Sequence, residues 1–285
     1  MLPRVLGATL TTAALACLPF IPTPAAGQVK GPTNLGKSTA KRGLPAPRSE
    51  DGKVDFSGVY HAPGYGPGDP ASKTGESTSH NLARDLDQAD VPMQPWAKEL
   101  YEKRRYDLSK DDPEGYCLPM GVPRVNPYPW KMVQTDTLLA ILFEGNVHSY
   151  RQIFLDGRRH DPDVEETFWG DSIGTWEGKE ALVVDTVGLG FGDGRNNKSW
   201  LDGGGHPRTN KLHVMERFTR PEYARIVREI TIDDPGAYTR PWKVVQTSQL
   251  APDWEIMENI CNENHDGKGN NQDVQHLVGR LPDEK

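Results

Sequence analysis

The chain has 285 residues, a formal net charge of −7 and 26% charged residues, and its basic residues are scattered along it. Nucleic-acid-binding proteins usually present a basic patch, so the composition predicts no nucleic-acid partner. The 35% of apolar residues suffices for a core at this length, and the 24 prolines and 29 glycines favour many short elements joined by turns.

The N-terminal 27 residues have the features of a Sec-type signal peptide. A positive charge at Arg4 precedes an apolar run over 5–20, and small residues form a cleavage site before Gln28. The run is short and interrupted by proline, which disfavours a stable membrane anchor. We therefore expect a periplasmic or secreted protein, with lipidation of Cys17 as the alternative.

Export changes the interpretation of the cysteines. After Cys17 is removed with the signal peptide, Cys117 and Cys261 remain. Two cysteines in an oxidising compartment favour one disulfide bond, and two separate buried thiols are the alternative. The bond would close a long loop and contribute about 4–5 kcal/mol to stability in the chain-entropy model.

The segment before the first of these cysteines predicts little regular structure. Residues 28–50 are rich in Lys, Pro, Gly, Ser and Thr, which is typical of a flexible lead-in. Residues 51–60 predict a turn and a short strand, and residues 61–92 predict a long polar loop. From residue 51 to residue 285 we expect a single β-rich domain.

One helix is predicted over 94–105. A proline at its second position suits the first helical turn. Trp96, Leu100 and Tyr101 form its inner face, and the basic residues at 103–105 lie in the last turn, where they complement the helix dipole.

A series of runs rich in Val, Ile, Thr and aromatic residues follows Cys117 and predicts β-strands. The runs span 130–135, 137–143, 147–155, 172–176, 180–187, 211–219, 223–233, 241–250 and 253–261. The Asp156-Gly157 dipeptide favours a hairpin turn, and short turns elsewhere predict an antiparallel meander. We expect a mainly β fold in which the meander closes into a lipocalin-like barrel or forms a curved sheet, because closure removes edge strands.

The strongest candidate for chemistry is the stretch from Trp200 to Phe218. Gly203–Gly205 predict an exposed loop at the lip of the sheet, and this loop carries Asp202 and His206. An aspartate four residues before a histidine can orient the imidazole for acid–base catalysis. The alternative is a solvent-exposed histidine on an Asp-Gly loop. In the catalytic interpretation, His206→Ala abolishes turnover and leaves the fold intact.

The strand after this loop supplies two further candidates. Alternation over 212–218 places Glu216 among apolar neighbours, either as a third catalytic group or as the partner of Arg228 in a buried ion pair. His213 lies on the same predicted strand and is a candidate for substrate binding. The histidines and acids of the stretch would offer metal ligands, but no established metal-binding spacing is present, so we expect neither a metal nor a cofactor.

A second set of candidates surrounds His160. It follows the predicted turn and lies near Arg151 and the Arg158-Arg159 pair in sequence, and these arginines could clamp a carboxylate or sulfate on a substrate. Trp169 and Trp200 would bind a flat or sugar-like molecule at a cleft mouth. The alternatives are a soluble surface for the arginines and core packing for the tryptophans.

The ordered motifs of the chain resemble a group of exported, β-rich bacterial proteins. The motifs are DFSGVY at 55–60, CLPMGVPR at 117–124, PYPWKMVQT at 127–135, DGRRH at 156–160, SIGTWEG at 172–178, LVVDTVG at 182–188, WLD…GHP at 200–207, ERF at 216–218, IDDPGAYTRPW at 232–242 and CNEN at 261–264. The resemblance covers residues 51–280 and implies a single exported β-rich domain without implying a mechanism. Arg208 stands where similar sequences often have a histidine, which argues further against a metal, and the longer glycine-rich segment 189–198 suggests a different substrate preference.

These features predict an exported enzyme that performs acid–base chemistry on a small or sugar-like molecule in a cleft at the barrel mouth. Hydrolysis, elimination and isomerisation all fit. The alternatives are a non-catalytic, lipocalin-like carrier of an apolar or aromatic ligand and a structural protein of the envelope. A water-open cleft with His206 against a carboxylate would favour the enzyme, and an apolar cavity without converging titratable groups would favour the carrier. The sequence makes no prediction about the oligomeric state.

Overall fold

The computed structural model describes residues 40–62, 91–107, 110–124, 128–145, 149–190 and 200–258. These residues belong to one compact unit, Pro32–Lys285. The predicted signal peptide, its cleavage site and Cys261 lie outside the described residues. Among the described helices, none is long and apolar enough to cross a membrane.

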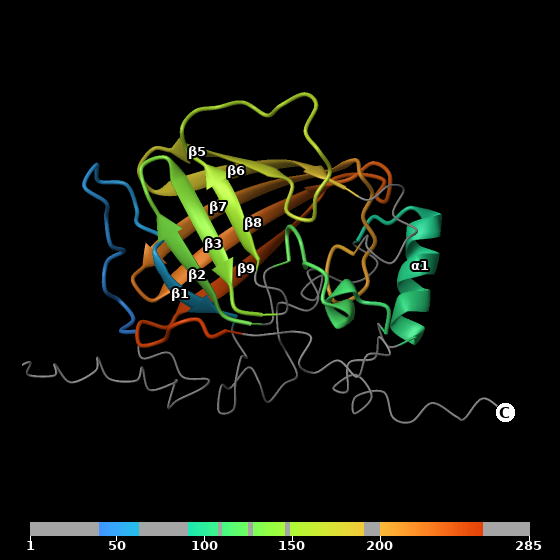
Figure 1. The fold of residues 1–285 in the computed structure, drawn as a ribbon, viewed down its shortest axis with the longest axis horizontal. Coiled ribbons are helices and arrows are strands. Elements are labelled where there is room, and N and C mark those ends of the chain that lie inside the picture. The colour runs from blue at the N-terminus through green and yellow to red at the C-terminus, as the bar shows by residue number, and fades with distance from the viewer. Residues whose placement is uncertain are drawn as a thin grey trace, which may run out of the picture. The chain divides into compact units, whose positions relative to one another are not determined.

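The described strands form a closed barrel in which each strand pairs with the next along the chain and the last pairs with the first (Figure 1). The strands are β1 (Gly58–His61), β2 (Trp130–Gln134), β3 (Leu138–Phe143), β4 (Tyr150–Phe154), β5 (Asp171–Glu177), β6 (Ala181–Leu189), β7 (Leu212–Glu222), β8 (Arg225–Asp233) and β9 (Trp242–Leu250). Closure pairs the backbone groups that an open sheet would leave at its edges. The predicted mainly β architecture, with a closed barrel, is confirmed.

The two ends of the barrel differ in what connects and covers them. Short turns join β2 to β3, β5 to β6 and β7 to β8 at one end, which we call the turn end. The longer connections lie at the opposite end, where the structure describes residues 200–211 before β7 and residues 234–241 before β9. The helix α1 (Pro95–Tyr106) packs there, and the Trp96 indole Nε1–H donates to the Gly236 carbonyl at 3.0 Å. We call this the helix end, and Figure 1 shows α1 beyond the strands on that side.

Alternation along the strands sends one set of side chains into the barrel. In β7 the inward residues are buried and those between them are partly exposed, except near the end of the strand. The interior holds two apolar clusters. The cluster at the turn end includes Phe56, Met132 and Phe218, and the cluster at the helix end includes Leu189 and Trp242.

The helix α1 lies where the sequence predicts it, but its buried face is shifted: Trp96 and Leu100, predicted on the inner face, are half-buried, and Ala97 is buried instead. Tyr101 is buried as expected, and so is Arg104, which was predicted only to complement the dipole in the last turn. The Arg104 Nη1–H donates to the Gly205 carbonyl at 3.2 Å, and its guanidinium lies 4.4 Å from the centre of the Trp200 ring. Burial lowers the pKa of Arg104 to about 10. These partners lie about a hundred residues away in sequence, so helical periodicity could not reveal them.

The connection between β4 and β5 differs from the prediction. Asp156-Gly157 bends the chain, with a φ of +78° at Gly157, but no hairpin follows, because β4 and β5 pair in parallel. Asp156 instead accepts a hydrogen bond from the Arg158 Nε–H at 2.9 Å, and the chain returns to the helix end before β5 begins. The predicted hairpin is therefore wrong. The run after the turn is polar and contains Pro162, which disfavours a second strand at that point.

Two segments outside the central strands also differ. The predicted strand 253–261 is wrong over its described part, since residues 251–258 form a turn and irregular chain, and 259–261 lie outside the described residues. β9 already pairs with β8 and β1, so no edge is free for another strand; Trp254 instead stacks on His61 with the ring centroids 5.0 Å apart. Residues 40–50, expected within the flexible lead-in, pack against the turn end of the barrel.

Candidate functional site

Asp202 and His206 form a buried pair at the helix end of the barrel. The His206 Nδ1 atom lies 2.8 Å from Asp202 Oδ2, and the His206 backbone N–H donates to Asp202 Oδ1 at 3.2 Å. Because an ionised carboxylate only accepts hydrogen bonds, this contact places a ring proton on Nδ1 and leaves Nε2 as the acceptor of the neutral imidazole. Nε2 is buried and has no hydrogen-bond partner in the described part of the chain.

The predicted exposure of this pair is wrong, since both side chains have 0% exposure. Tyr101 of α1 stacks on the His206 ring with the centroids 4.3 Å apart, and the Trp242 ring lies 6.1 Å away. Gly205 has a φ of +95°, and a Cβ there would lie 3.0 Å from the Arg104 Cβ, so this glycine allows close packing against α1. His206→Ala would open a cavity beside Tyr101, and the expectation of an intact fold in that variant is therefore withdrawn.

Glu216 lies on β7 where the two apolar clusters meet. Its neighbours on the inward face are Val214 of the helix-end cluster and Phe218 of the turn-end cluster. Glu216 Oε2 accepts from the Arg151 Nη2–H at 2.5 Å, and Oε1 accepts from the Arg228 Nη1–H at 3.0 Å. We call Arg151, Glu216 and Arg228 the triad. Both of its arginines are buried, and they reach Glu216 from β4 and β8.

Further hydrogen bonds fix the triad in place. Arg151 Nε–H donates to the Ser172 hydroxyl at 3.1 Å, and Arg228 Nη2–H donates to the Pro123 carbonyl at 2.9 Å. Burial favours the neutral form of Glu216, but the charges of the two arginines outweigh it and hold the pKa of this carboxyl below its ordinary value. A carboxylate that stays ionised with both oxygens engaged is better suited to holding strands together than to proton transfer, so the geometry favours a structural ion pair.

His160, Asp171, Asp185 and His213 form a chain of contacts on the outer wall of the barrel. His160 Nδ1 lies 2.7 Å from Asp171 Oδ2, and His213 Nε2 lies 2.5 Å from Asp185 Oδ1. His160 Nε2 lies 3.8 Å from the same Asp185 oxygen. The two predicted histidines are thus brought together, but outside the barrel and partly exposed. Arg151, predicted beside His160, points into the interior instead, because it has the inward parity on β4.

The two predicted aromatic residues occupy different places. Trp200 is buried beneath the Arg104 guanidinium and packs the loop against α1, so it does not lie at a cleft mouth. Trp169 stacks on Phe143 with the ring centroids 4.5 Å apart and packs against both apolar clusters. Its indole Nε1 is buried and, within the described ranges, has no hydrogen-bond partner.

Arg208 was not predicted as a site residue. Its exposure is 0%, and none of its three side-chain nitrogens has a hydrogen-bond partner among the described residues. Burial lowers the pKa of Arg208 to about 10, although the charge of Asp234 opposes this shift. Its position two residues after His206 was the available signal in the sequence, but burial of an arginine in a predicted exposed loop could not be foreseen.

The remaining predictions concern the cysteines and metal ligands. Cys117 follows the 3₁₀ helix η3 (Pro113–Tyr116) and is disulfide-bonded. Its partner lies outside the described residues, so the pairing with Cys261 stays a prediction. Within the described ranges, no group of three His, Cys, Asp or Glu side chains is arranged to hold a metal ion.

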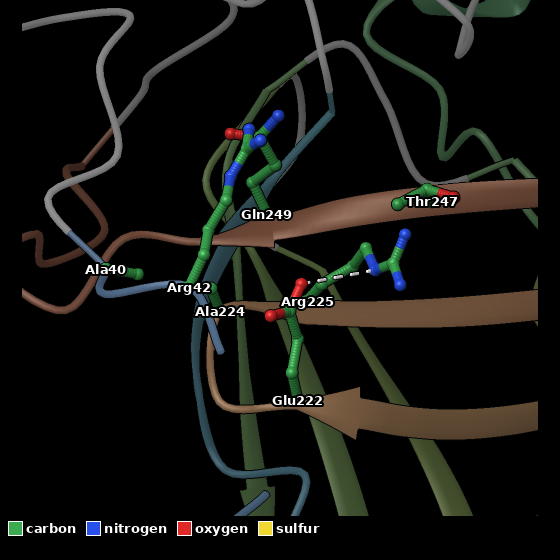
Figure 2. Close-up of a pocket in the computed structure, with 7 residues that line it drawn as sticks. All are labelled: Ala40, Arg42, Glu222, Ala224, Arg225, Thr247 and Gln249. Carbon is green, nitrogen blue, oxygen red and sulfur yellow. Dashed lines mark ion pairs between the residues drawn. The ribbon is translucent and has the colours of Figure 1, made fainter. Parts of the chain in front are cut away.

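Two surface pockets lie at the turn end, away from His206. The larger has a volume of about 230 Å³ (Figure 2) and is lined by Ala40, Arg42, Glu222, Ala224, Arg225, Thr247 and Gln249. The smaller, about 110 Å³, lies beside Lys53, Asp136 and Trp176. Neither pocket is lined by a predicted site residue. The candidate catalytic groups are therefore the buried side chains of the helix end.

The structure brings Asp202 to His206 and His160 to His213, and it separates Glu216 and Arg151 from both pairs by placing them in the triad. Comparisons of the chain with protein-family models, with curated proteins and with solved structures found no match.

Proposed function

We propose that the protein is an exported enzyme in which His206, oriented by Asp202, acts as general base and general acid. The observation that carries the proposal is the fixed and buried imidazole, held at Nδ1 by Asp202 at 2.8 Å, whose Nε2 has no partner in the described chain. A general base needs a fixed ring and a nitrogen able to take a proton, and this arrangement supplies both.

In the proposed reaction, His206 Nε2 takes a proton from the substrate and returns it to another substrate atom or to a leaving group. The Asp202 carboxylate faces the positive charge that develops on the ring, and exclusion of bulk water strengthens this stabilisation. Elimination or isomerisation fits the burial of the pair better than hydrolysis does, because hydrolysis also needs a water molecule at the reacting atom.

Access to His206 requires movement of α1 or of the loop that it covers. Tyr101 lies against one face of the imidazole, and the Arg104 hydrogen bond to Gly205 ties the helix to the loop. Opening of this contact would admit the substrate, and its closure would exclude water during the reaction. The same apolar surroundings, with Trp169 and Trp242, favour the carrier as the second candidate, in which a ligand binds at the helix end without turnover.

The test compares wild-type protein with Asp202→Asn and His206→Gln, which keep most of the volume of the replaced side chains. Each protein is incubated with a mixture of small metabolites and sugars, and the consumption of every component is followed by mass spectrometry. We expect both variants to slow the reaction by roughly 10²–10⁴-fold. His213→Gln, on the outer wall, should retain the wild-type rate.

Thermal melts of the same samples separate loss of catalysis from loss of folding. Undiminished turnover in folded His206→Gln would contradict the proposal, and loss in His213→Gln instead would move the site to the outer wall. Binding of a component by the wild type without any turnover would leave the carrier as the function.

A further inference from the structure

Arg208 is a buried cation whose guanidinium is not bonded by the protein. Its backbone is anchored, because the preceding Pro207 pairs with Trp200 in a β-bridge and accepts a hydrogen bond from the Tyr238 hydroxyl at 2.9 Å. The side chain has 0% exposure, and Nε, Nη1 and Nη2 all lack partners in the described part of the chain. A guanidinium carries five N–H donors, and burying them unpaired is unfavourable for folding.

The nearby acid does not neutralise this guanidinium by direct contact. Asp234 accepts from the Thr209 backbone N–H at 2.6 Å and the Thr209 hydroxyl at 2.5 Å, and the Gly236 N–H donates to it at 3.0 Å. Its carboxylate is thus occupied in fixing the loop before β9. Asp234 acts on Arg208 only through its negative charge. This charge raises the pKa of Arg208 by less than burial lowers it.

A glycine in the backbone opposite Arg208 leaves room for the guanidinium. Gly121 has a φ of +74°, and a Cβ there would lie 3.2 Å from Arg208 Nη2 and 2.5 Å from the Phe168 carbonyl oxygen. A larger residue at 121 would therefore be strained and would press on the guanidinium. The residues next in sequence, Val122 and Trp169, belong to or pack against the helix-end apolar cluster, so Arg208 borders an apolar region.

Two buried donors that adjoin the helix-end cluster also lack an acceptor among the described residues. The indole Nε1 atoms of Trp169 and Trp242 have no hydrogen-bond partner among the described residues, and both rings contact the helix-end cluster. An indole N–H and a guanidinium can donate but cannot accept. These side chains cannot satisfy one another, and a ligand that only accepts would complement them.

We propose that Arg208 binds the carboxylate of a monocarboxylic acid whose apolar or aromatic body packs against the helix-end cluster. The inference rests on the proposed function and deepens it, because it names the substrate class for the site of His206, which precedes Arg208 by two residues in the chain. A carboxylate only accepts, and its two oxygens match the guanidinium fork with parallel hydrogen bonds. One guanidinium without a bonded counter-charge calls for one negative charge, which favours a monocarboxylate over a phosphate dianion.

The experiment measures melting temperature and heat of binding with benzoate and hexanoate, alongside benzamide and inorganic phosphate at constant ionic strength. The proteins are the wild type, Arg208→Met and Arg208→Lys. With a carboxylate about 100-fold above its Kd, we expect the wild-type melting temperature to rise by roughly 5 °C or more. Arg208→Met should respond by less than about 1 °C, and Arg208→Lys should respond weakly, since it keeps the charge and loses the fork. Arg158→Met, an exposed position, should respond as the wild type does.

No response to either carboxylate in the wild type, or an equal response in folded Arg208→Met, overturns the inference. An equal response to benzamide or phosphate also overturns it, because the site would then not select a carboxylate. His206→Gln separates the two proposals, since it should still bind benzoate. If carboxylates bind through Arg208 but His206→Gln keeps full turnover, only the proposed function is contradicted. Turnover that requires His206 and proceeds normally in Arg208→Met would sink only this inference.

Discussion

The triad and Arg208 contain the same buried cation in two different settings. Arg151 and Arg228 are 1% and 5% exposed, and each is bonded to Glu216. Arg208 is 0% exposed and is bonded to no side chain within the described residues. All three residues are buried arginines, so they differ only in whether a carboxylate is bonded to the guanidinium.

The difference separates a role in architecture from a role in binding. The triad links β4, β7 and β8, and the inward parity of its residues on these strands lets the three charges meet in the barrel interior. A buried ion pair satisfied in this way contributes little net stability but is costly to break. A buried guanidinium without a partner lowers the stability of the folded protein. Such unfavourable features persist where a function requires them.

Removal of the shared anion should have the largest effect. Glu216→Gln leaves two buried guanidinium groups without a counter-charge, and we expect a loss of about 3–5 kcal/mol in the free energy of unfolding. The melting temperature should fall by roughly 6–20 °C. Glu229→Gln is the matched control, because Glu229 pairs with Arg217 on the surface and should change stability by less than about 1 kcal/mol. Similar melting temperatures for the two variants would show that the triad is not a structural unit.

Replacement of the unpaired arginine should change stability in the opposite direction. Arg208→Met keeps an unbranched apolar side chain and removes the buried donors, so we expect an increase of about 1–3 kcal/mol in the free energy of unfolding without ligand. Urea titrations of the ligand-free protein measure this difference. A marked loss of stability would mean that Arg208 serves the fold, and the contrast with the triad would then disappear.

The sequence predicts the barrel well because the information for strands is local. Alternation over β7 and β8 marks Glu216 and Arg228 as inward residues, and the structure pairs them. The parallel pairing of β4 with β5 escaped prediction because Asp156-Gly157 carries the same turn signal whether or not a strand follows. The prediction of a strand at 253–261 was wrong over its described part because β1 already closes the barrel by pairing with β9, which local sequence does not show.

The residues of the candidate site were predicted from the sequence, but their burial was not. Asp202 and His206 contact each other as expected, because four residues of a tight loop bring them together. Their burial depends on Tyr101 and Arg104, which lie far away in the chain and arrive only when α1 packs on the barrel. Arg208 could not be recognised for the same reason, since an arginine without a partner is defined by contacts that the sequence does not show.

The smallest effect concerns pH and distinguishes the two settings by titration. The arginines hold the pKa of Glu216 below its ordinary value despite burial, so the folded state binds this proton less tightly than the unfolded state does. The stabilisation from ionised Glu216 is therefore complete above the unfolded pKa of about 4.3 and is lost as pH falls through the folded pKa. The difference in unfolding free energy between wild type and Glu216→Gln should be constant from pH 7 to about pH 4.3 and should shrink below it.

Arg208 should behave differently over the same range. Its pKa is lowered to about 10, so its charge is complete in both the folded and the unfolded state at acid pH. Asp234 acts on Arg208 through its charge but without direct contact, so the difference between wild type and Arg208→Met should change less from pH 7 to about pH 3 than the difference for Glu216→Gln does. Urea titrations across this range measure both differences. A constant difference for Glu216→Gln would mean that its carboxyl binds protons alike in both states, and the triad would not then depend on an ionised glutamate. A difference for Arg208→Met that changes with acid as much as the difference for Glu216→Gln would reveal a carboxylate bonded to Arg208, which the comparison of the two settings does not allow.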